Sequence, residues 1–152
     1  MENVLITSGI SAFAQRVAKL FAEKNLVFAD SKPIPTPFIN TGKYVAIPSP
    51  DKSSYVHEVL KVCLDLSINK VVPLGKDEYL PLARSKVLFE EYGIVVLLPD
   101  LENLADIPKL INPTRVNSPK IVLKERVPED LGVFGIYSAN DDREWSLCFV
   151  NE

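Results

Sequence analysis

The stretch that decides the fold runs from Lys70 to Asp100 and reads KVVPLGKDEYLPLARSKVLFEEYGIVVLLPD. It starts with a short apolar, β-branched run at 70–73, passes through a charged turn at 74–78, and shows helical spacing from 80 to 92. Gly93 ends the predicted helix, and residues 94–98 are apolar without interruption. Because this last run does not alternate with polar residues, we expect a strand covered on both faces, as in a parallel sheet with helices on each side.

The first 50 residues show the same alternation of strand and helix patterns. Residues 4–6 and 26–29 predict two strands, and the apolar positions from Phe13 to Phe21 predict the helix between them. Such a strand–helix–strand unit is parallel by default. Prolines at 33, 35 and 37 predict a surface excursion without helix, and residues 43–46 predict a third strand. A second helix is expected over 51–66, with Asp51 or Ser53 as its cap.

These elements predict an α/β fold, namely a Rossmann-like three-layer domain with a mainly parallel sheet over residues 1–112. The pattern changes after Pro113, where three strands joined by polar turns are expected at 120–123, 132–137 and 145–150. We interpret residues 113–152 as a small antiparallel β extension. Since it is too small to be stable alone, we expect it to pack on the first domain as part of a single folding unit.

The overall composition limits the classes of partner. The formal net charge is −3, so we expect neither nucleic acid nor an anionic membrane as a partner, because both require a basic surface. No basic segment precedes an apolar stretch at the N-terminus, and no apolar run approaches about 18 residues. We therefore expect a cytoplasmic protein. Cys63 and Cys148 are expected to be reduced core thiols.

The loop after the first strand is a candidate ligand site. A dinucleotide fingerprint needs three glycines here, but the three positions hold Gly9, Ser11 and Ala14, and Asp30 follows at the end of the next strand. Close helix packing through a tight turn is the simpler interpretation. The predicted helix can also bind one anion at its N-terminus through Ser8, Ser11 and backbone N–H groups.

The charged turn at 74–78 is the second candidate, because open α/β sheets bind ligands at the carboxyl ends of their strands. Lys76, Asp77 and Glu78 offer one cation and two carboxylates for acid–base chemistry. In the alternative interpretation, Asp77 caps the next helix, Glu78 lies in its first turn and Lys76 is solvated. The candidate ligand-binding residues are Thr7, Ser8, Gly9, Ser11, Asp30, Gly75, Lys76, Asp77 and Glu78.

Several catalytic motifs are missing from the sequence. His57 is the only histidine and has no histidine or cysteine beside it, and no Gly-x-Ser-x-Gly elbow or P-loop motif occurs. We therefore assign no catalytic residue and expect no metal and no cofactor.

Residues 4 to about 100 resemble the pre-ATP-grasp domain of ATP-grasp ligases of the carbamoyl-phosphate-synthase type. The resemblance rests on VLITSG at 4–9, on Asp30, and on YVAIPSPD at 44–51. Its strongest part is VPLGKDEYLPLA at 72–83, continued by FEEYGI at 89–94. The glycine-rich phosphate loop and the metal-binding residues of a full ATP-grasp module have no counterpart in this chain.

The resemblance implies a domain that packs against an ATP-grasp module and helps to form the acceptor-substrate end of its cleft. We therefore expect a stand-alone, non-catalytic domain that binds a small-molecule ligand or completes a separately encoded ATP-grasp-type protein. One alternative is an enzyme that acts on a small substrate through Lys76, Asp77 or Glu78 without ATP. Another is a structural homodimer whose terminal strands pair across a two-fold axis.

Overall fold

A computed structural model describes residues 2–105, 107, 109–114, 121–124, 135–139 and 145–150. Five strands form its first sheet: β1 (Asn3–Ile6), β2 (Asn25–Asp30), β3 (Tyr44–Ala46), β4 (Lys70–Val72) and β5 (Val95–Val96). Their order is β3-β2-β1-β4-β5, and every neighbouring pair is parallel. The predicted Rossmann-like α/β fold with a parallel sheet is confirmed.

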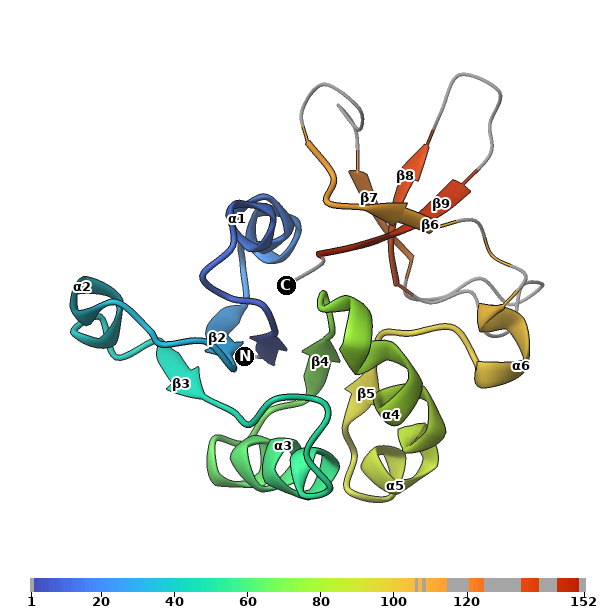
Figure 1. Cartoon of the computed structure of the whole chain (residues 1–152). Helices are drawn as coiled ribbons and strands as arrows, with labels where there is room; N and C mark the ends of the chain where they lie inside the picture. The colour runs from blue at the N-terminus through green and yellow to red at the C-terminus, as the bar shows by residue number, and fades with distance from the viewer. Residues whose placement is uncertain are drawn as a thin grey trace.

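Helices cover both faces of this sheet (Figure 1). The helix α1 (Ala12–Ala18) and the 3-10 turn η1 (Lys19–Phe21) lie on one face, and α3 (Tyr55–Asp65), α4 (Tyr79–Arg84) and α5 (Lys86–Glu91) lie on the other. Val4 and Ile6 pack toward α1, whereas Leu5 packs toward α3. All three are fully buried, which explains why the central strands show no alternation of polar and apolar residues.

The C-terminal part forms a second sheet of four strands in the order β6-β9-β8-β7. Its strands are β6 (Lys109–Ile111), β7 (Ile121–Lys124), β8 (Gly135–Ala139) and β9 (Trp145–Phe149). Strands β7, β8 and β9 pair antiparallel as expected, but β6 joins β9 in parallel, so the extension is a mixed sheet. Residues 109–111 show no strand pattern in the sequence, and Asn112 and Pro113 follow them directly. They form a strand because they pair with β9. Positions 120 and 132–134 of the predicted strands lie outside the described residues.

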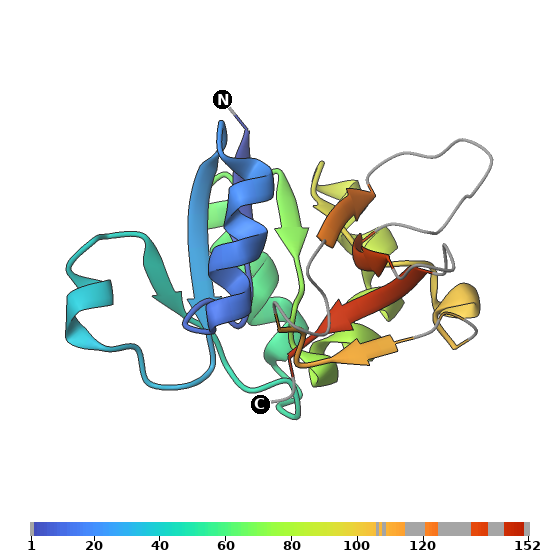
Figure 2. The ribbon, with the colours of Figure 1, turned by 90° about the horizontal axis from the view of Figure 1, so that it is seen from above.

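The second sheet is joined to the first domain by both packing and hydrogen bonds, and Figures 1 and 2 show the two sheets side by side. Leu147 and Phe149 belong to the core on the α4 side, and Cys148 belongs to the core on the α1 side. The Val150 N–H donates to the Leu74 carbonyl at 2.6 Å, and the Lys76 N–H donates to the Val150 carbonyl at 2.9 Å. The end of β9 therefore fixes the loop that follows β4.

Three local expectations were wrong. The proline-rich excursion contains a one-turn helix, α2 (Thr36–Ile39), because Pro37 lies in the first turn, where a missing N–H costs nothing. Helix α3 begins at Tyr55, and neither Asp51 nor Ser53 caps it. The predicted helix over 80–92 is divided at Ser85 into α4 and α5. A short helix, α6 (Leu101–Leu104), follows Asp100.

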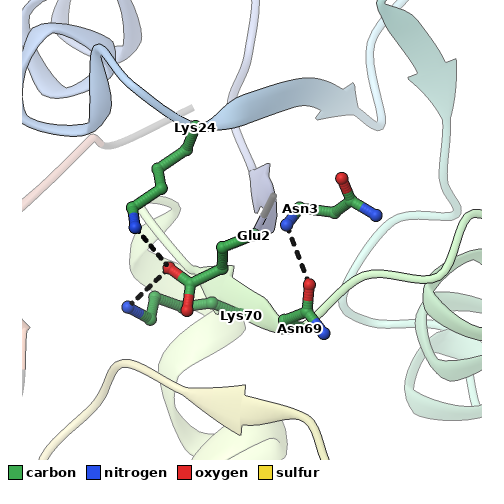
Figure 3. A network of polar contacts seen from close by, with 5 residues as sticks. All are labelled: Glu2, Asn3, Lys24, Asn69 and Lys70. Atoms are coloured by element: carbon green, nitrogen blue, oxygen red, sulfur yellow. Dashed lines mark hydrogen bonds and ion pairs between the residues drawn. The ribbon is translucent and has the colours of Figure 1, made fainter.

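The amino ends of the central strands are held by a polar network, which Figure 3 shows from close by. The Glu2 carboxylate lies 3.1 Å from the Lys70 ammonium and 3.8 Å from the Lys24 ammonium. The Asn3 N–H donates to the Asn69 side chain at 2.8 Å. These contacts lie at the amino ends of the strands, whereas parallel sheets bind ligands at the carboxyl ends of their strands. None of the helices in the described ranges has both the length and the apolar composition needed to cross a bilayer.

Candidate ligand-binding site

The strand order reverses between β1 and β4, at the centre of the sheet. The chain leaves β1 toward α1 on one face and leaves β4 toward α4 on the other. In open α/β sheets, this reversal point is where ligands bind, at the carboxyl ends of the strands. The loops at 7–11 and 74–78 both start at this edge, so the two predicted candidate loops are brought together.

Glu78 is the best-connected side chain of the second loop. It is only 4% exposed, and its carboxylate accepts hydrogen bonds from three directions. The Thr7 hydroxyl donates to Oε2, the Gly75 N–H donates to Oε2 at 3.0 Å, and the Tyr55 hydroxyl donates to Oε1 at 2.8 Å. The Thr7 hydroxyl also accepts the Leu74 N–H at 2.8 Å. Glu78 therefore holds the loop after β4 against the end of β1 and the start of α3.

Gly75 makes this arrangement possible. A Cβ atom at this position would lie 2.8 Å from Glu78 Oε2, closer than any ordinary contact. Gly75 is the N-cap residue of the turn Lys76–Glu78, and Glu78, at the third position of that turn, accepts the Gly75 N–H. The expected place of Glu78 in the first turn is confirmed. Lys76 and Asp77 are exposed. The expected capping role of Asp77 was wrong, because Asp77 lies inside this turn and the N-cap residue of α4 is Glu78.

The first loop is built for close packing. A Cβ atom on Gly9 would lie 2.6 Å from Phe28 Cβ, and the Gly9 N–H donates to the Ala29 carbonyl at 2.9 Å. Asp30 is 2% exposed and accepts the Ile10 N–H at 3.2 Å and the Lys32 N–H at 2.9 Å. The glycine therefore allows the loop to lie against β2, and the Asp30 carboxylate fixes it there.

The two serines of the first loop shape the turn into α1. The Ser11 hydroxyl accepts the Ala14 N–H at 3.1 Å and donates to the Ser8 carbonyl at 2.7 Å. Ser8 has a φ of 49°, in the left-handed region, and is 2% exposed. Both residues thus help to form the tight turn that the simpler interpretation expected.

A cleft of about 300 Å³ opens beside these loops. It is lined by Ser31, Lys32, Ser49, Pro50, Gly75, Lys76, Asp77 and Glu78. Four candidate residues, at 75–78, therefore line the cleft, which we call the polar cleft. The other five, at 7–9, 11 and 30, lie behind it or beside it and position the loops.

Sequence reasoning missed four lining residues. Ser31 and Lys32 come directly after β2, and Ser49 and Pro50 follow β3 by three and four residues. These residues follow the carboxyl ends of β2 and β3, where ligands of a parallel sheet can bind just as they can after β1 and β4. Because prolines follow both strands, at Pro33 after β2 and at Pro48 and Pro50 after β3, the pattern predicted surface turns at these positions.

The polar cleft presents both signs of charge. Lys32 and Lys76 are exposed cations from two different strand ends, and Asp77 is an exposed carboxylate. The Ser49 hydroxyl hydrogen-bonds to the Asp51 carboxylate near this edge, which lowers the pKa of Asp51. The Glu78 carboxylate, by contrast, is turned toward its internal donors. The cleft can therefore bind an anionic group through the two lysines and a polar or cationic group through Asp77.

Among the described residues, no three His, Cys, Asp or Glu side chains come together in a way that could hold a metal ion. His57 is exposed on α3. The chain matches no protein-family model and no curated protein.

Proposed function

We propose that this chain is a pre-ATP-grasp-like domain that binds a small polar anion in the polar cleft and carries out no reaction itself. The observation that supports this most directly is the pairing of Lys32 and Lys76 at one cleft. The two lysines follow different strands of a parallel sheet, at the edge where such sheets bind ligands. The volume of about 300 Å³ is at the lower end of small-molecule pockets.

The lining suggests the chemical class of the ligand. Two ammonium groups suit a carboxylate or phosphate, and the Ser49 hydroxyl, which donates to the Asp51 carboxylate, can accept a hydrogen bond from a ligand hydroxyl or amine. Asp77 adds an acceptor for an amine or hydroxyl of the same ligand. Amino acids, hydroxy acids and small phosphate esters combine these groups.

The hydrogen bonds of Glu78 favour binding over catalysis. A general base needs a carboxylate that is aimed at the substrate, yet both Glu78 oxygens accept protein donors. Lys76 and Asp77 are both exposed to solvent, whereas catalytic sites usually exclude water from the reacting groups. We therefore assign Glu78 to shaping the cleft and the two lysines to binding.

A thermal-shift screen against amino acids, hydroxy acids, phosphate esters and nucleotides tests the proposal. Free ligand at about 100 times its dissociation constant should add about 2.7 kcal/mol to the free energy of unfolding, which is several degrees. The shift should disappear in Lys32→Ala and persist in Lys61→Ala, because Lys61 is an exposed lysine of α3 that does not line the cleft. A screen without any shift would contradict ligand binding, and sedimentation and pull-down experiments would then test the homodimer and the partner ligase.

A further inference from the structure

We propose that a second cavity, between α4, α6 and β9, binds a small apolar carboxylate with its charged end at Lys76. This apolar groove has a volume of about 350 Å³. It is lined by Lys76, Tyr79, Leu80, Leu101, Leu104, Ala105, Lys109 and Phe149. The groove shares Lys76 with the polar cleft, but the inference does not require that the polar cleft binds a ligand.

Two aromatic rings form a buried part of the groove lining. The Tyr79 and Phe149 ring centroids are 4.4 Å apart with a tilt of 59°, and both residues are under 5% exposed. The Tyr79 hydroxyl donates to the Cys148 carbonyl, which fixes the ring against β9. The groove therefore has a rigid apolar base that is present without a ligand.

Two leucines form more open walls. Leu80 on α4 is 49% exposed and Leu101 on α6 is 43% exposed, although both border the same cavity. Single exposed leucines are common on protein surfaces, but two that border one apolar cavity form a contiguous patch. Covering them with an apolar ligand would remove that surface from water.

The charged residues of the groove indicate that the ligand carries a negative charge at one end. Among its described lining residues, the charged ones are Lys76 and Lys109, so both charges are positive. The Lys109 ammonium donates to the carbonyls of Leu104 at 2.6 Å and Ile107 at 3.0 Å, which holds it in place. The Lys76 ammonium has no hydrogen bond or ion pair to any residue of the described ranges. One carboxylate beside Lys76 would complement this lining.

The size of the groove favours a small molecule over a protein segment. A volume of about 350 Å³ lies within the range of small-molecule pockets, whereas a stable protein interface covers about 800 Å² on each partner. An arylalkanoic acid or a medium-chain fatty acid has the required single charge and apolar body. A polyanion would gain nothing from the apolar walls.

An amide NMR titration of the whole chain with phenylpropanoate tests this inference, with the uncharged phenylpropanol as the matched ligand. We expect saturable shifts at Tyr79, Leu80 and Leu101, and at least tenfold weaker binding of the alcohol. Lys76→Met keeps the apolar stem and should weaken binding of the acid about fivefold or more. Leu80→Glu and, as a second variant, Leu101→Glu should weaken it tenfold or more by placing a negative charge on the wall.

Val87→Glu is the matched control, because Val87 is 67% exposed on α5 and does not line the groove. It should bind the acid as the unaltered chain does. The inference is overturned if the acid causes no shift at the groove amides up to about 10 mM, a concentration that would reveal even millimolar affinity. Equal binding of acid and alcohol would also overturn it. Shifts confined to Ser31, Lys32 and Ser49 would assign the acid to the polar cleft, which overturns the groove but supports the proposed function.

Discussion

The Tyr55 hydroxyl donates to the Glu78 carboxylate at 2.8 Å, although the two residues are 23 positions apart. Tyr55 is the first residue of α3, and Glu78 ends the turn after β4. Both side chains are buried, so no water competes for this bond. The bond joins the loop that borders the polar cleft to a helix of the core, and it therefore sets the position of Gly75 to Asp77 at the cleft.

Tyr55→Phe should lower the free energy of unfolding by about 1–2 kcal/mol, because a buried acceptor loses a donor while the ring remains. Urea denaturation measures this change. Tyr92→Phe is the matched control, since Tyr92 is 55% exposed, and it should stay within about 0.5 kcal/mol of the unaltered protein. Equal effects of the two substitutions would contradict the role that we give to the Tyr55–Glu78 bond.

Gly9→Ala should destabilise the protein by about 1–3 kcal/mol, because the new Cβ atom overlaps Phe28 Cβ and must push the loop away from β2. Gly42→Ala is a useful comparison, since a Cβ there meets nothing and the cost, about 1–2 kcal/mol at most, comes from its φ of 74° alone. Amide NMR should show shifts spreading into β2 for Gly9→Ala only. A Gly9→Ala protein that is as stable as the parent and unshifted in β2 would refute the packing role.

The parallel sheet was predictable because its strands are apolar on both faces. Leu5 and Ile6 point to opposite faces and both are fully buried, so the sequence cannot alternate there. The position of the site was predictable too, because ligands of open α/β sheets bind at the carboxyl ends of the strands. The strand β6 was not predictable, since Lys109–Ile111 becomes a strand through its pairing with β9, which lies far along the chain.

The inner detail of the site was not predictable for a related reason. Whether Glu78 faces solvent or the interior depends on Thr7 and Tyr55, which donate to it from distant positions in the chain. Whether Ser31 and Ser49 line a common cleft depends on the pairing of β2 with β3. Local spacing does not encode such contacts, so sequence reasoning reached the loops but not the directions of their side chains.

Lys86→Met should cost about 1–3 kcal/mol, because the buried ammonium donates to the Leu98 carbonyl at 2.8 Å and that carbonyl would lose its partner. Asp100→Asn, which weakens the ion pair of 2.9 Å with the same lysine, should cost less than about 1 kcal/mol, because the Asp100 side chain is 46% exposed. Chemical denaturation of both variants measures the difference. A larger loss for Asp100→Asn would show that the ion pair, not the carbonyl contact, dominates.

Cys63 should make stability decrease at alkaline pH. Burial raises the pKa of its thiol from 9.0 to about 12, so above pH 9 the unfolded chain loses a proton that the folded protein keeps. The free energy of unfolding therefore falls as the pH rises from 9 toward 12, by up to about 1.4 kcal/mol per pH unit from this group.

Cys63→Ala isolates this contribution, because other groups titrate equally in both proteins. The difference in unfolding free energy between the unaltered protein and Cys63→Ala should be constant below pH 9. Above pH 9, the unfolding free energy of the unaltered protein should fall relative to that of Cys63→Ala. A difference that stays constant up to pH 11, about two units above the ordinary thiol pKa, would contradict a thiol held neutral by burial.

The central claim is that the polar cleft binds a small anion, and an amide NMR titration with amino acids, hydroxy acids and phosphate esters tests it most directly. We expect at least one ligand to cause saturable shifts at Ser31, Lys32, Ser49 and Gly75 to Asp77, and we expect these shifts to be lost in Lys32→Ala but kept in Lys61→Ala. Saturable shifts that avoid these positions, or no shift with any of the ligands, would contradict it.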